Sequence, residues 1–380
     1  MIGATGYEKD AMTDGLARLH ITGFGSLADV SLEPGRLTVL IGANGSGKSN
    51  LLRALRMVPL MRTGSLQRFV AEAGGASALL HYGPKRTQAI SVELEFTQSG
   101  RRNRYFARLG FAAGDRLMYL DESVGEQPDP DAPMRMTSLG TGHWESLLRD
   151  TKADTTAQTV NYWISQLSFF HFHDTSMTSA LRTHARGEDD RFLRSDGSNL
   201  AAYLGRLEQS SDEADQKAWH RINRFVHRIA PSVKTLCPTP VHNGGTSVRL
   251  DWIDDQDERF GAHQLSDGTL RAIALITALA QPTDKLPKFV SIDEPELGLH
   301  PAAIRLLSEL VRSVSRHTQV LFATQSTAFL DYFEPHEVVV VERSAGASSF
   351  SRLVAHSLDG WLEDYSLSEI FDKGVIGGRP

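Results

Sequence analysis

Residues 42–49 read Gly-Ala-Asn-Gly-Ser-Gly-Lys-Ser, and this stretch decides the fold. It follows an apolar, β-branched run at 36–41, which is typical of a buried strand, and it precedes a segment at 50–55 with the apolar spacing of a helix. The stretch fits the P-loop pattern, in which the N–H groups of a glycine-rich backbone surround phosphates. The order strand, loop and helix therefore predicts a nucleotide-binding α/β domain.

The P-loop predicts how ATP and Mg²⁺ would be bound. Lys48 would place its positive charge beside the β and γ phosphates, and the Ser49 hydroxyl would bind Mg²⁺. The positive end of the following helix would face the same phosphates. The predicted nucleotide-binding residues are Gly42, Asn44, Gly45, Ser46, Gly47, Lys48, Ser49 and Asn50.

A second apolar run, at 288–292, ends in two carboxylates, Asp293 and Glu294, before Pro295 stops the strand. The carboxyl ends of parallel strands are where α/β sheets bind ligands. We therefore expect Asp293 to hold Mg²⁺ together with Ser49. Glu294 would orient the attacking water or accept its proton, which makes it a predicted catalytic residue beside Lys48.

The segment Leu-Ser-Asp-Gly-Thr at 265–269 precedes the acidic strand by some two dozen residues. Ser266 is a favourable N-cap for a helix predicted at 270–280, and Gly268 leaves the first turn without a side chain. Such a helix start is an anion site. After the acidic strand, a predicted helix at 302–314 leads to a predicted strand at 319–324, which ends in Gln325.

Taken in order, these segments resemble the head of an ABC-type ATPase of the SMC/RecF-like branch. Asn44, Asn50, the signature segment without the glutamine of transporters, and Gly-Leu-His-Pro at 298–301 favour that branch. Within it, the chain is similar to the standalone prokaryotic "AAA family" ATPases related to RecF and to the OLD ATPases. The segments 171–176 and 373–380 belong to this pattern, and the resemblance covers about residues 16–177 and 246–380.

The resemblance implies a head-to-tail homodimer, which could assemble further, in which two protomers enclose two ATP molecules. Ser266, Asp267 and Gly268 would then act in trans on the nucleotide of the partner. Gln325 stands at the switch position, where most ABC ATPases have histidine. A glutamine can hydrogen-bond the γ-phosphate but cannot carry a proton, so hydrolysis would be slow or gated by a partner. The implied role is genome maintenance or antiphage defence, with a separately encoded effector such as a nuclease, and with double-stranded DNA as a further partner.

The predicted fold class is an α/β P-loop ABC-type ATPase head with an antiparallel β subdomain and an inserted helical subdomain. An N-terminal segment, 1–14, could be ordered or disordered. A first lobe at 15–177 would hold the P-loop and, between 90 and 120, an antiparallel meander, with a loop at 125–141. A helical insertion would occupy 178–245, and a second lobe 246–380.

Composition limits the other possibilities. The 380 residues carry a net charge of −6, so contact with nucleic acid would need a local basic patch. A single cysteine excludes an internal disulfide and a multi-cysteine metal site. No apolar run reaches the length of a membrane span or of a signal-peptide core, which predicts a cytoplasmic protein without a membrane partner.

Two groups of arginines could contact DNA backbone or could be ordinary solvated faces. They are Arg101, Arg102 and Arg104 in the meander, and Arg221, Arg224 and Arg228 on a predicted helix. His171 and His173 would share one face of a strand at 168–172, which is a metal-ligand spacing in some hydrolases. The preferred interpretation is that His173 and Asp174 form a Q-loop-like contact between ATP and the helical subdomain.

Two alternatives change the function class. The first is a slow, nucleotide-gated scaffold that binds ATP and holds an effector, which Gln325 favours. The second is a transporter ATPase subunit, against which the signature segment argues.

Overall fold

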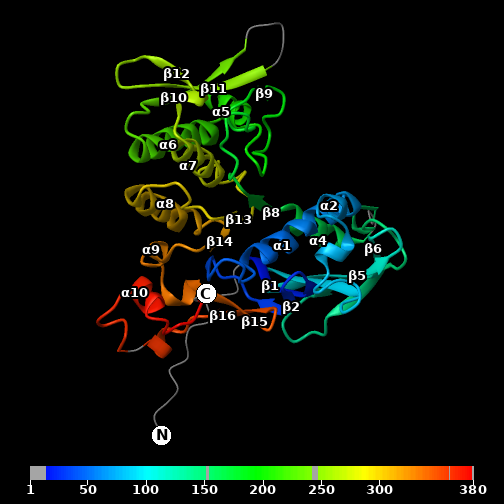
Figure 1. The fold of residues 1–380 in the computed structure, drawn as a ribbon. Helices are drawn as coiled ribbons and strands as arrows, with labels where there is room; N and C mark the ends of the chain where they lie inside the picture. The colour runs from blue at the N-terminus through cyan, green and yellow to red at the C-terminus, as the bar shows by residue number, and fades with distance from the viewer. Residues whose placement is uncertain (1–13, 151–153, 242–246, 359, 379–380) are drawn as a thin grey trace. The chain divides into compact units, whose positions relative to one another are not determined.

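The computed structural model describes residues 14–150, 154–241, 247–358 and 360–378 (Figure 1). Nearly all of the N-terminal segment considered above therefore lies outside the described residues. The chain forms two compact units. Unit 1 comprises Met1–Leu167 and Pro335–Pro380, and unit 2 comprises Ser168–Glu334.

Unit 1 contains a six-stranded antiparallel sheet in the order β2-β1-β4-β5-β6-β7. Alternating apolar residues place one face of this sheet in the core. The meander predicted between 90 and 120 is confirmed, because the strands at 89–98, 101–112 and 116–127 pair antiparallel in chain order. The strands are β1 (Gly15–Phe24), β2 (Leu27–Leu32), β4 (Ala89–Gln98), β5 (Arg101–Ala112), β6 (Arg116–Gln127) and β7 (Arg135–Gly140).

The predicted loop at 125–141 is wrong at both ends. β6 continues to Gln127, and β7 (Arg135–Gly140) pairs with it. Only the residues between them, rich in proline and aspartate, form the connection. β7 is an edge strand whose side chains are mostly exposed, so it has no apolar alternation by which the sequence could predict it.

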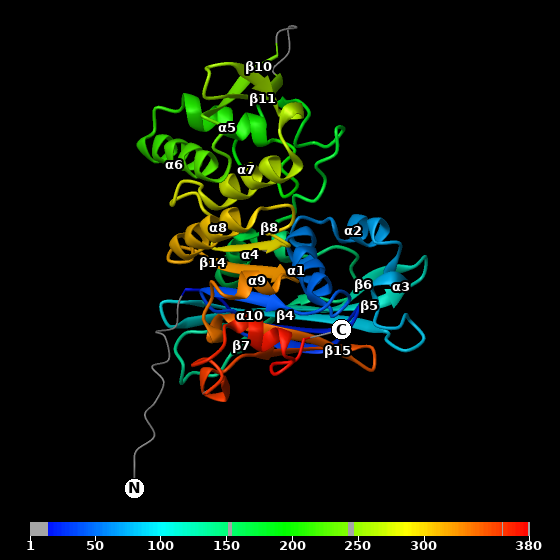
Figure 2. The same cartoon turned by 60° about the vertical axis from the view of Figure 1, so that its left-hand side comes forward.

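The P-loop of unit 1 follows β3 (Leu37–Ile41), all five residues of which are buried. β3 lies parallel to β15 (Val338–Ser344), and β15 pairs antiparallel with β16 (Ala347–Arg352). The P-loop leads into α1 (Lys48–Arg62). Figure 2 shows α1 on the same side of the antiparallel sheet as α2 (Leu66–Glu72) and α4 (Thr155–Ser165). The remaining helices of unit 1 are α3 (Ala76–Leu79) and α10 (Leu367–Asp372).

Unit 2 contains the acidic strand. β13 (Phe289–Asp293) and β14 (Gln319–Thr324) run parallel, with Asp293 opposite Ala323. The strands predicted at 288–292 and 319–324 are confirmed. The sequence could predict them because continuous apolar runs between polar breaks are typical of buried parallel strands. Three helices lie close to these strands in the chain: α7 (Asp267–Leu279), α8 (Pro301–Val314) and α9 (Thr327–Leu330). The strand β8 (Leu167–Phe170) precedes them.

The segment at 178–245 is not purely helical, which corrects the prediction. It contains α5 (Leu200–Gln209) and α6 (Glu213–Ile229), but also β9 (Ala185–Arg186) and β10 (Thr235–Pro240). Both strands pair with β11 (Ser247–Ile253), which also pairs with β12 (Arg259–Gly261). Two prolines in β10 and the shortness of β9 hide these strands in the sequence.

Candidate functional site

The P-loop has the geometry of a phosphate-binding turn. Lys48 is 6% exposed, and its Nζ donates to the carbonyls of Gly42 (2.6 Å) and Ala43 (3.0 Å). Gly45 has φ +78° and a Cβ placed there would meet no atom within 4 Å, so this backbone is open on its outer side. Backbone N–H groups, an ammonium and hydroxyls are the donors that a polyphosphate requires.

A cluster of hydroxyls holds the P-loop from behind. The Ser348 hydroxyl, on β16, donates to the carbonyl of Ser46 (2.5 Å) and contacts the Ser26 hydroxyl (2.7 Å). A Cβ at Gly47, where φ is +119°, would lie 2.0 Å from the Ser348 oxygen. The Asn50 amide donates to Ser26 Oγ (2.8 Å), so its side chain supports the loop in this structure. This hydroxyl cluster was not foreseen from the sequence, since its members lie far apart in the chain.

A cavity of 340 Å³ opens beside the P-loop. It is lined by Ala43, Asn44, Gly45, Ser46, Val341, Glu342, Arg343, Gly346 and Gly378. The Ser46 hydroxyl is buried without a hydrogen-bond partner among the described residues, and the Ser49 side chain is exposed. Hydroxyl oxygens are ligands that suit Mg²⁺. The residues of the loop therefore fit a magnesium nucleotide.

The C-terminal segment forms one wall of this cavity. The N–H of Ala43 donates to the carbonyl of Gly378 (2.9 Å), and the N–H of Gly378 donates to the Glu342 carboxylate (2.9 Å). The resemblance pointed to the segment 373–380 as part of the family pattern, and Gly378 of this segment bonds to the P-loop.

In unit 2, Glu294 and Gln325 lie together at the carboxyl ends of two adjacent parallel strands. The Gln325 Nε2 donates to Glu294 Oε1 at 3.1 Å. The N–H of Glu294 donates to the carbonyl of Ala323 (2.7 Å), and its φ is +46°, a left-handed conformation that non-glycine residues rarely adopt. Asp293 is the last residue of β13 and is partly exposed.

A third carboxylate, that of Glu296, lies buried next to this pair. The Thr324 hydroxyl donates to its Oε1, while its Oε2 has no hydrogen-bond partner among the described residues. Burial raises the pKa of Glu296 above its usual value, and the neighbouring charge of Glu294 adds to this increase. The sequence does not distinguish Glu296 as a buried site residue, because a buried carboxylate and an exposed one have the same sequence signal.

The signature segment begins α7 as predicted. Ser266 Oγ accepts the N–H of Thr269 (3.1 Å), and the side chains of Ser266 and Asp267 are exposed. A Cβ on Gly268 would lie 2.2 Å from the carbonyl oxygen of Gly298. Gly268 is therefore required within unit 2 itself, because it lets the loop after the acidic strand approach α7.

Two arginines that the sequence did not identify connect the signature segment to its surroundings. Arg271 is 8% exposed and donates to three carbonyls, those of Phe172 (2.8 Å), His173 (3.0 Å) and Leu297 (2.6 Å). Arg182 donates to the carbonyls of Thr175, Ala262 and Leu265 and forms a 2.7 Å ion pair with Asp267. The backbone of the predicted Q-loop-like residue His173 is thus tied to α7 and to the loop at 297–298.

The structure does not place His171 and His173 on a strand, because β8 ends at Phe170. Within the described residues, no group of three metal-ligating side chains could hold a metal ion. The His173 side chain is exposed. The Asp174 carboxylate accepts the N–H (3.0 Å) and the hydroxyl (2.7 Å) of Ser176, which lowers its pKa.

Three of the six arginines proposed for DNA are bonded to groups of this chain, one of them in an exposed ion pair. Arg104 pairs with Glu93 and Glu95, and Arg228 pairs with Glu309 (3.1 Å). Arg221 donates to the carbonyls of Ala280 (2.8 Å) and Gln281 (2.6 Å), where α7 ends, and burial lowers its pKa. Arg101 and Arg224 have exposed side chains, and Arg102 is half-exposed.

A model of the family described as "AAA domain, putative AbiEii toxin, Type IV TA system" matches residues 37–331. Among curated proteins, the Old nuclease of Escherichia phage P2 is 22% identical over 92% of this chain and 62% of its own length. The OLD nuclease of Thermus scotoductus is also 22% identical, over 83% of this chain and 60% of its own. The RecF protein of Anaeromyxobacter dehalogenans strain 2CP-1 is 38% identical over 27% of this chain and 28% of its own. The chain thus spans about 60% of the length of its OLD relatives.

Among solved structures, the Smc head domain of Pyrococcus furiosus bound to the C-terminal domain of ScpA aligns with a TM-score of 0.57 at 15% identity. The alignment covers 93% of this chain and 99% of the other. A second SmcHead structure, bound to the C-winged helix domain of ScpA, aligns with a TM-score of 0.55 over 90% of this chain. These likenesses confirm the predicted fold class. No helix in the described part of the chain is both long and apolar enough to cross a membrane.

Proposed function

We propose that this chain, which belongs to the family described as "AAA domain, putative AbiEii toxin, Type IV TA system" and to the SMC/RecF-like ATPases related to OLD proteins, hydrolyses Mg-ATP. The observation that carries the proposal is the hydrogen bond between Gln325 and Glu294 at the carboxyl ends of parallel strands. A carboxylate held in this way can orient a water molecule. The P-loop geometry around Lys48 supports the same function.

We assign roles to residues as follows. Lys48 and the backbone of residues 44–49 bind phosphate, and the Gln325 amide contacts the γ-phosphate. Glu294 orients the attacking water and accepts its proton. Ser49 and Asp293 would hold Mg²⁺, which neutralises negative charge on the phosphates when bound.

The signature segment acts on a second copy of the chain in this proposal. Ser266 and Asp267 are exposed at the start of a 13-residue helix, and the N–H groups of its first turn can receive an anion. Gly268 keeps this turn free of a side chain. ATP bound to one protomer would thus contact Ser266, Asp267 and Gly268 of the other, and the homodimer would form with ATP and separate after hydrolysis.

DNA and a separate effector complete the proposed role in genome maintenance or antiphage defence. The names of the relatives include nucleases and a DNA replication and repair protein, which supports an action on DNA. Arg101, Arg102 and Arg224 remain candidate contacts to DNA phosphates, because their side chains are at least partly exposed. A nuclease encoded elsewhere is the proposed effector, and the cytoplasm is the proposed location.

A second candidate function retains nucleotide binding but involves little ATP hydrolysis. A nucleotide-gated scaffold would bind ATP, dimerise and hold its effector while hydrolysing rarely. Gln325 favours this candidate, because an amide cannot relay a proton as histidine can. The proposal of hydrolysis requires that Glu294 alone accepts the proton.

The test measures phosphate release from Mg-ATP and mass in solution, with and without duplex DNA, for the wild type, Lys48→Ala and Glu294→Gln. Hydrolysis predicts that Glu294→Gln loses about 10²–10⁴-fold in rate while its ATP-dependent dimer persists. Lys48→Ala should lose both nucleotide binding and the dimer. Equal behaviour of the wild type and Glu294→Gln in rate and mass would support the scaffold. A wild-type mass that ATP does not change would contradict the dimer.

A further inference from the structure

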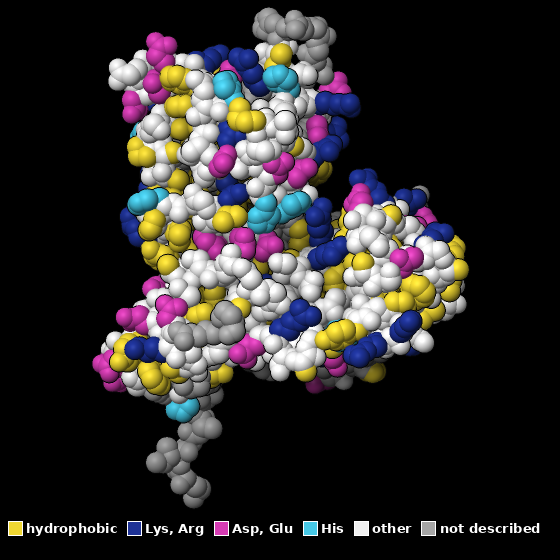
Figure 3. Space-filling view, viewed as in Figure 1, with side chains coloured by type: hydrophobic (Ala, Val, Ile, Leu, Met, Phe, Trp, Pro, Cys, Tyr) yellow, Lys and Arg dark blue, Asp and Glu magenta, His cyan; other side chains and the backbone are white. Residues whose placement is uncertain are grey.

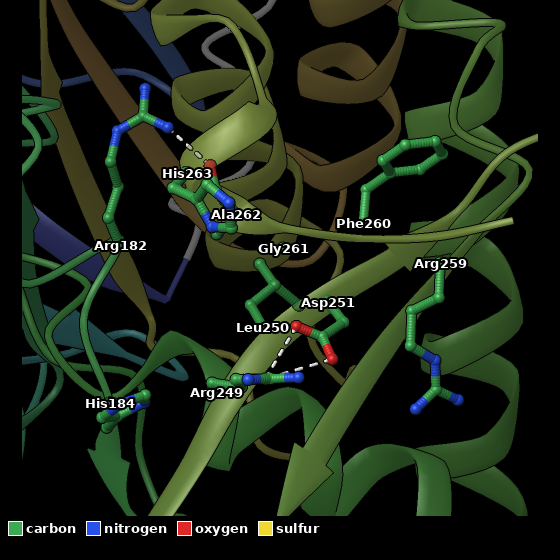
Figure 4. A pocket seen from close by; sticks show the side chains of 10 residues that line it. All are labelled: Arg182, His184, Arg249, Leu250, Asp251, Arg259, Phe260, Gly261, Ala262 and His263. Carbon is green, nitrogen blue, oxygen red and sulfur yellow. Dashed lines mark hydrogen bonds and ion pairs between the residues drawn. The ribbon is translucent and has the colours of Figure 1, made fainter. Parts of the chain in front are cut away.

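A second cavity, of 260 Å³, lies in unit 2 between β11, β12 and the segment around Arg182 (Figure 4). Figure 4 shows Arg249 and Asp251 facing each other on β11, Arg259 on the neighbouring strand, and Phe260 pointing away from this pair. The cavity lies just upstream of the signature segment in the chain, because the 3₁₀ turn Ala262–Gln264 (η2) forms part of its wall.

The lining of this cavity is strongly basic. Three arginines and two histidines line it together with one carboxylate, that of Asp251, which is 1% exposed. Figure 3 shows Lys, Arg and His side chains at the end of unit 2 that carries β9, β11 and β12, with Asp and Glu side chains among them. The lining residues with basic side chains are Arg182, His184, Arg249, Arg259 and His263.

The charges in the cavity do not balance. Asp251 lies 3.0 Å from the Nε of Arg249, and the ion pair of Arg182 is with Asp267. Arg259 makes no hydrogen bond or ion pair within the described residues. It is exposed, and it interacts with the exposed carboxylate of Glu208, whose pKa is raised by partial burial and lowered by the charge of Arg259. Arg249 and Arg182 are therefore ion-paired, whereas Arg259 has only its longer-range interaction with Glu208.

Most groups in the cavity that lack hydrogen-bond partners among the described residues are donors, but the buried Oδ1 of Asp251, 3.0 Å from the Nε of Arg249, is an acceptor that forms no hydrogen bond. Within the described residues, the side chains of His184 and His263 also form no hydrogen bond or ion pair, and both are exposed. Guanidinium and imidazole groups that converge on one cavity are suited to a phosphate, which accepts several hydrogen bonds at once. The Phe260 ring stacks on Trp252, with the ring centroids 4.8 Å apart, and points away from Arg249 and Asp251.

We propose that this cavity is a second anion site, distinct from the P-loop, that binds a phosphate group, either inorganic or at the end of a nucleotide. Arg259, His184 and His263 would bind the phosphate, and Arg249 would provide the part of its guanidinium that Asp251 leaves accessible. At about 30 Å³ per water molecule, the cavity has room for a phosphate with part of a nucleotide attached.

Binding of a phosphate in this cavity would affect the signature segment through Arg182. This side chain lines the cavity, donates to the carbonyls of Ala262 (2.5 Å) and Leu265 (3.0 Å), and pairs with Asp267. A phosphate in the cavity would compete with Asp267 for the guanidinium and so loosen the start of α7. The importance of this coupling for dimerisation rests on the proposed function, but the binding itself does not.

The experiment uses the full chain carrying Lys48→Ala, so that the P-loop cannot account for binding. Calorimetry measures the affinities for inorganic phosphate, pyrophosphate and AMP at constant ionic strength. We expect saturable binding that Arg259→Ala or His184→Ala weakens about tenfold. Arg316→Ala, which removes an exposed arginine elsewhere in unit 2, is the matched control and should leave affinity unchanged. Tighter binding of AMP than of phosphate would identify a nucleotide, and equal affinities would identify the phosphate group alone.

Absence of saturable binding, or equal weakening by Arg259→Ala and Arg316→Ala, would overturn the site. Hydrogen exchange tests the coupling in the same Lys48→Ala protein. Pyrophosphate should accelerate exchange of the amides at 266–270, and unchanged exchange with the site filled would refute the coupling while leaving the site. Neither measurement depends on ATP hydrolysis, so a result that overturns the anion site would be distinguishable from failure of the proposed function.

Discussion

The side-chain amide of Gln325 donates a hydrogen bond of 3.1 Å to the carboxylate of Glu294. The two residues follow adjacent parallel strands, and the backbone N–H of Glu294 is bonded to the second strand as well. The orientation of the Glu294 carboxylate therefore depends on Gln325. In the proposed mechanism, Gln325 positions Glu294 as well as contacting the γ-phosphate.

Replacement of Gln325 by alanine should lower the rate of ATP hydrolysis by roughly ten- to a hundredfold. A hydrogen bond to a charged group contributes about 1.5–3 kcal/mol, and its loss would leave the Glu294 carboxylate misoriented. Phosphate release at saturating Mg-ATP measures the effect. Gln256→Ala, at an exposed turn, is the control. An unchanged rate in Gln325→Ala would show that Glu294 does not need this contact.

The left-handed backbone at Glu294 predicts that a glycine at this position gives a more stable protein than an alanine does. Its φ of +46° costs a residue with a Cβ about 1–2 kcal/mol, a cost that glycine does not have. Glu294→Gly should therefore be more stable than Glu294→Ala by about this amount, although both lose the carboxylate. Urea unfolding of the two variants gives the difference directly, and equal midpoints would contradict the strained backbone.

Replacement of Gly268 by alanine should destabilise unit 2. The new Cβ would lie 2.2 Å from the Gly298 carbonyl oxygen, so the loop must move, at a cost of about 1–3 kcal/mol. Gly205→Ala is a matched control inside α5, where the nearest atom to a new Cβ is 3.4 Å away. That change should be neutral or stabilising by up to about 1 kcal/mol. Thermal unfolding of both variants measures the contrast, and similar melting temperatures would exclude the close approach.

Burial of Glu296 predicts a pH dependence of stability. Its pKa is raised in the folded state, so the folded chain binds the proton more tightly than the unfolded chain does. The stability that protonation contributes is complete below the unfolded pKa and is lost as pH rises through the folded pKa. Glu296→Gln cannot titrate, so its free energy of unfolding relative to the wild type should increase with pH across this interval. Denaturant unfolding from pH 4 to 8 measures the difference, and parallel curves would refute the shift.

The elements that the sequence predicted well are those whose residues are buried as a block. β3, β13 and β14 are continuous apolar runs between polar breaks, and α7 has a serine cap. The strands that it missed, β7, β9 and β10, are short, exposed or interrupted by proline. Their pairing depends on partners that lie elsewhere in the chain, and no local pattern encodes it.

The residues of the candidate site likewise fall into those that the sequence predicts and those that it does not. Lys48 and Glu294 belong to motifs whose spacing is local, so the sequence predicts them. The roles of Arg271, Arg182 and Ser348 arise from contacts between segments that are distant in the chain. Such contacts follow from the folded arrangement, and a lone arginine or serine has no sequence signal for them.

The Ser348 hydroxyl bonds to the P-loop carbonyl of Ser46 across a separation of 302 residues. During synthesis, the P-loop therefore leaves the ribosome long before the strand that supports it. At 5–20 residues per second, the delay is roughly 15–60 s. Throughout that interval the loop lacks both the Ser348 hydroxyl and the wall that β15 provides. A nascent chain should consequently acquire its affinity for nucleotide only when β16 has emerged, which keeps incomplete chains from capturing ATP.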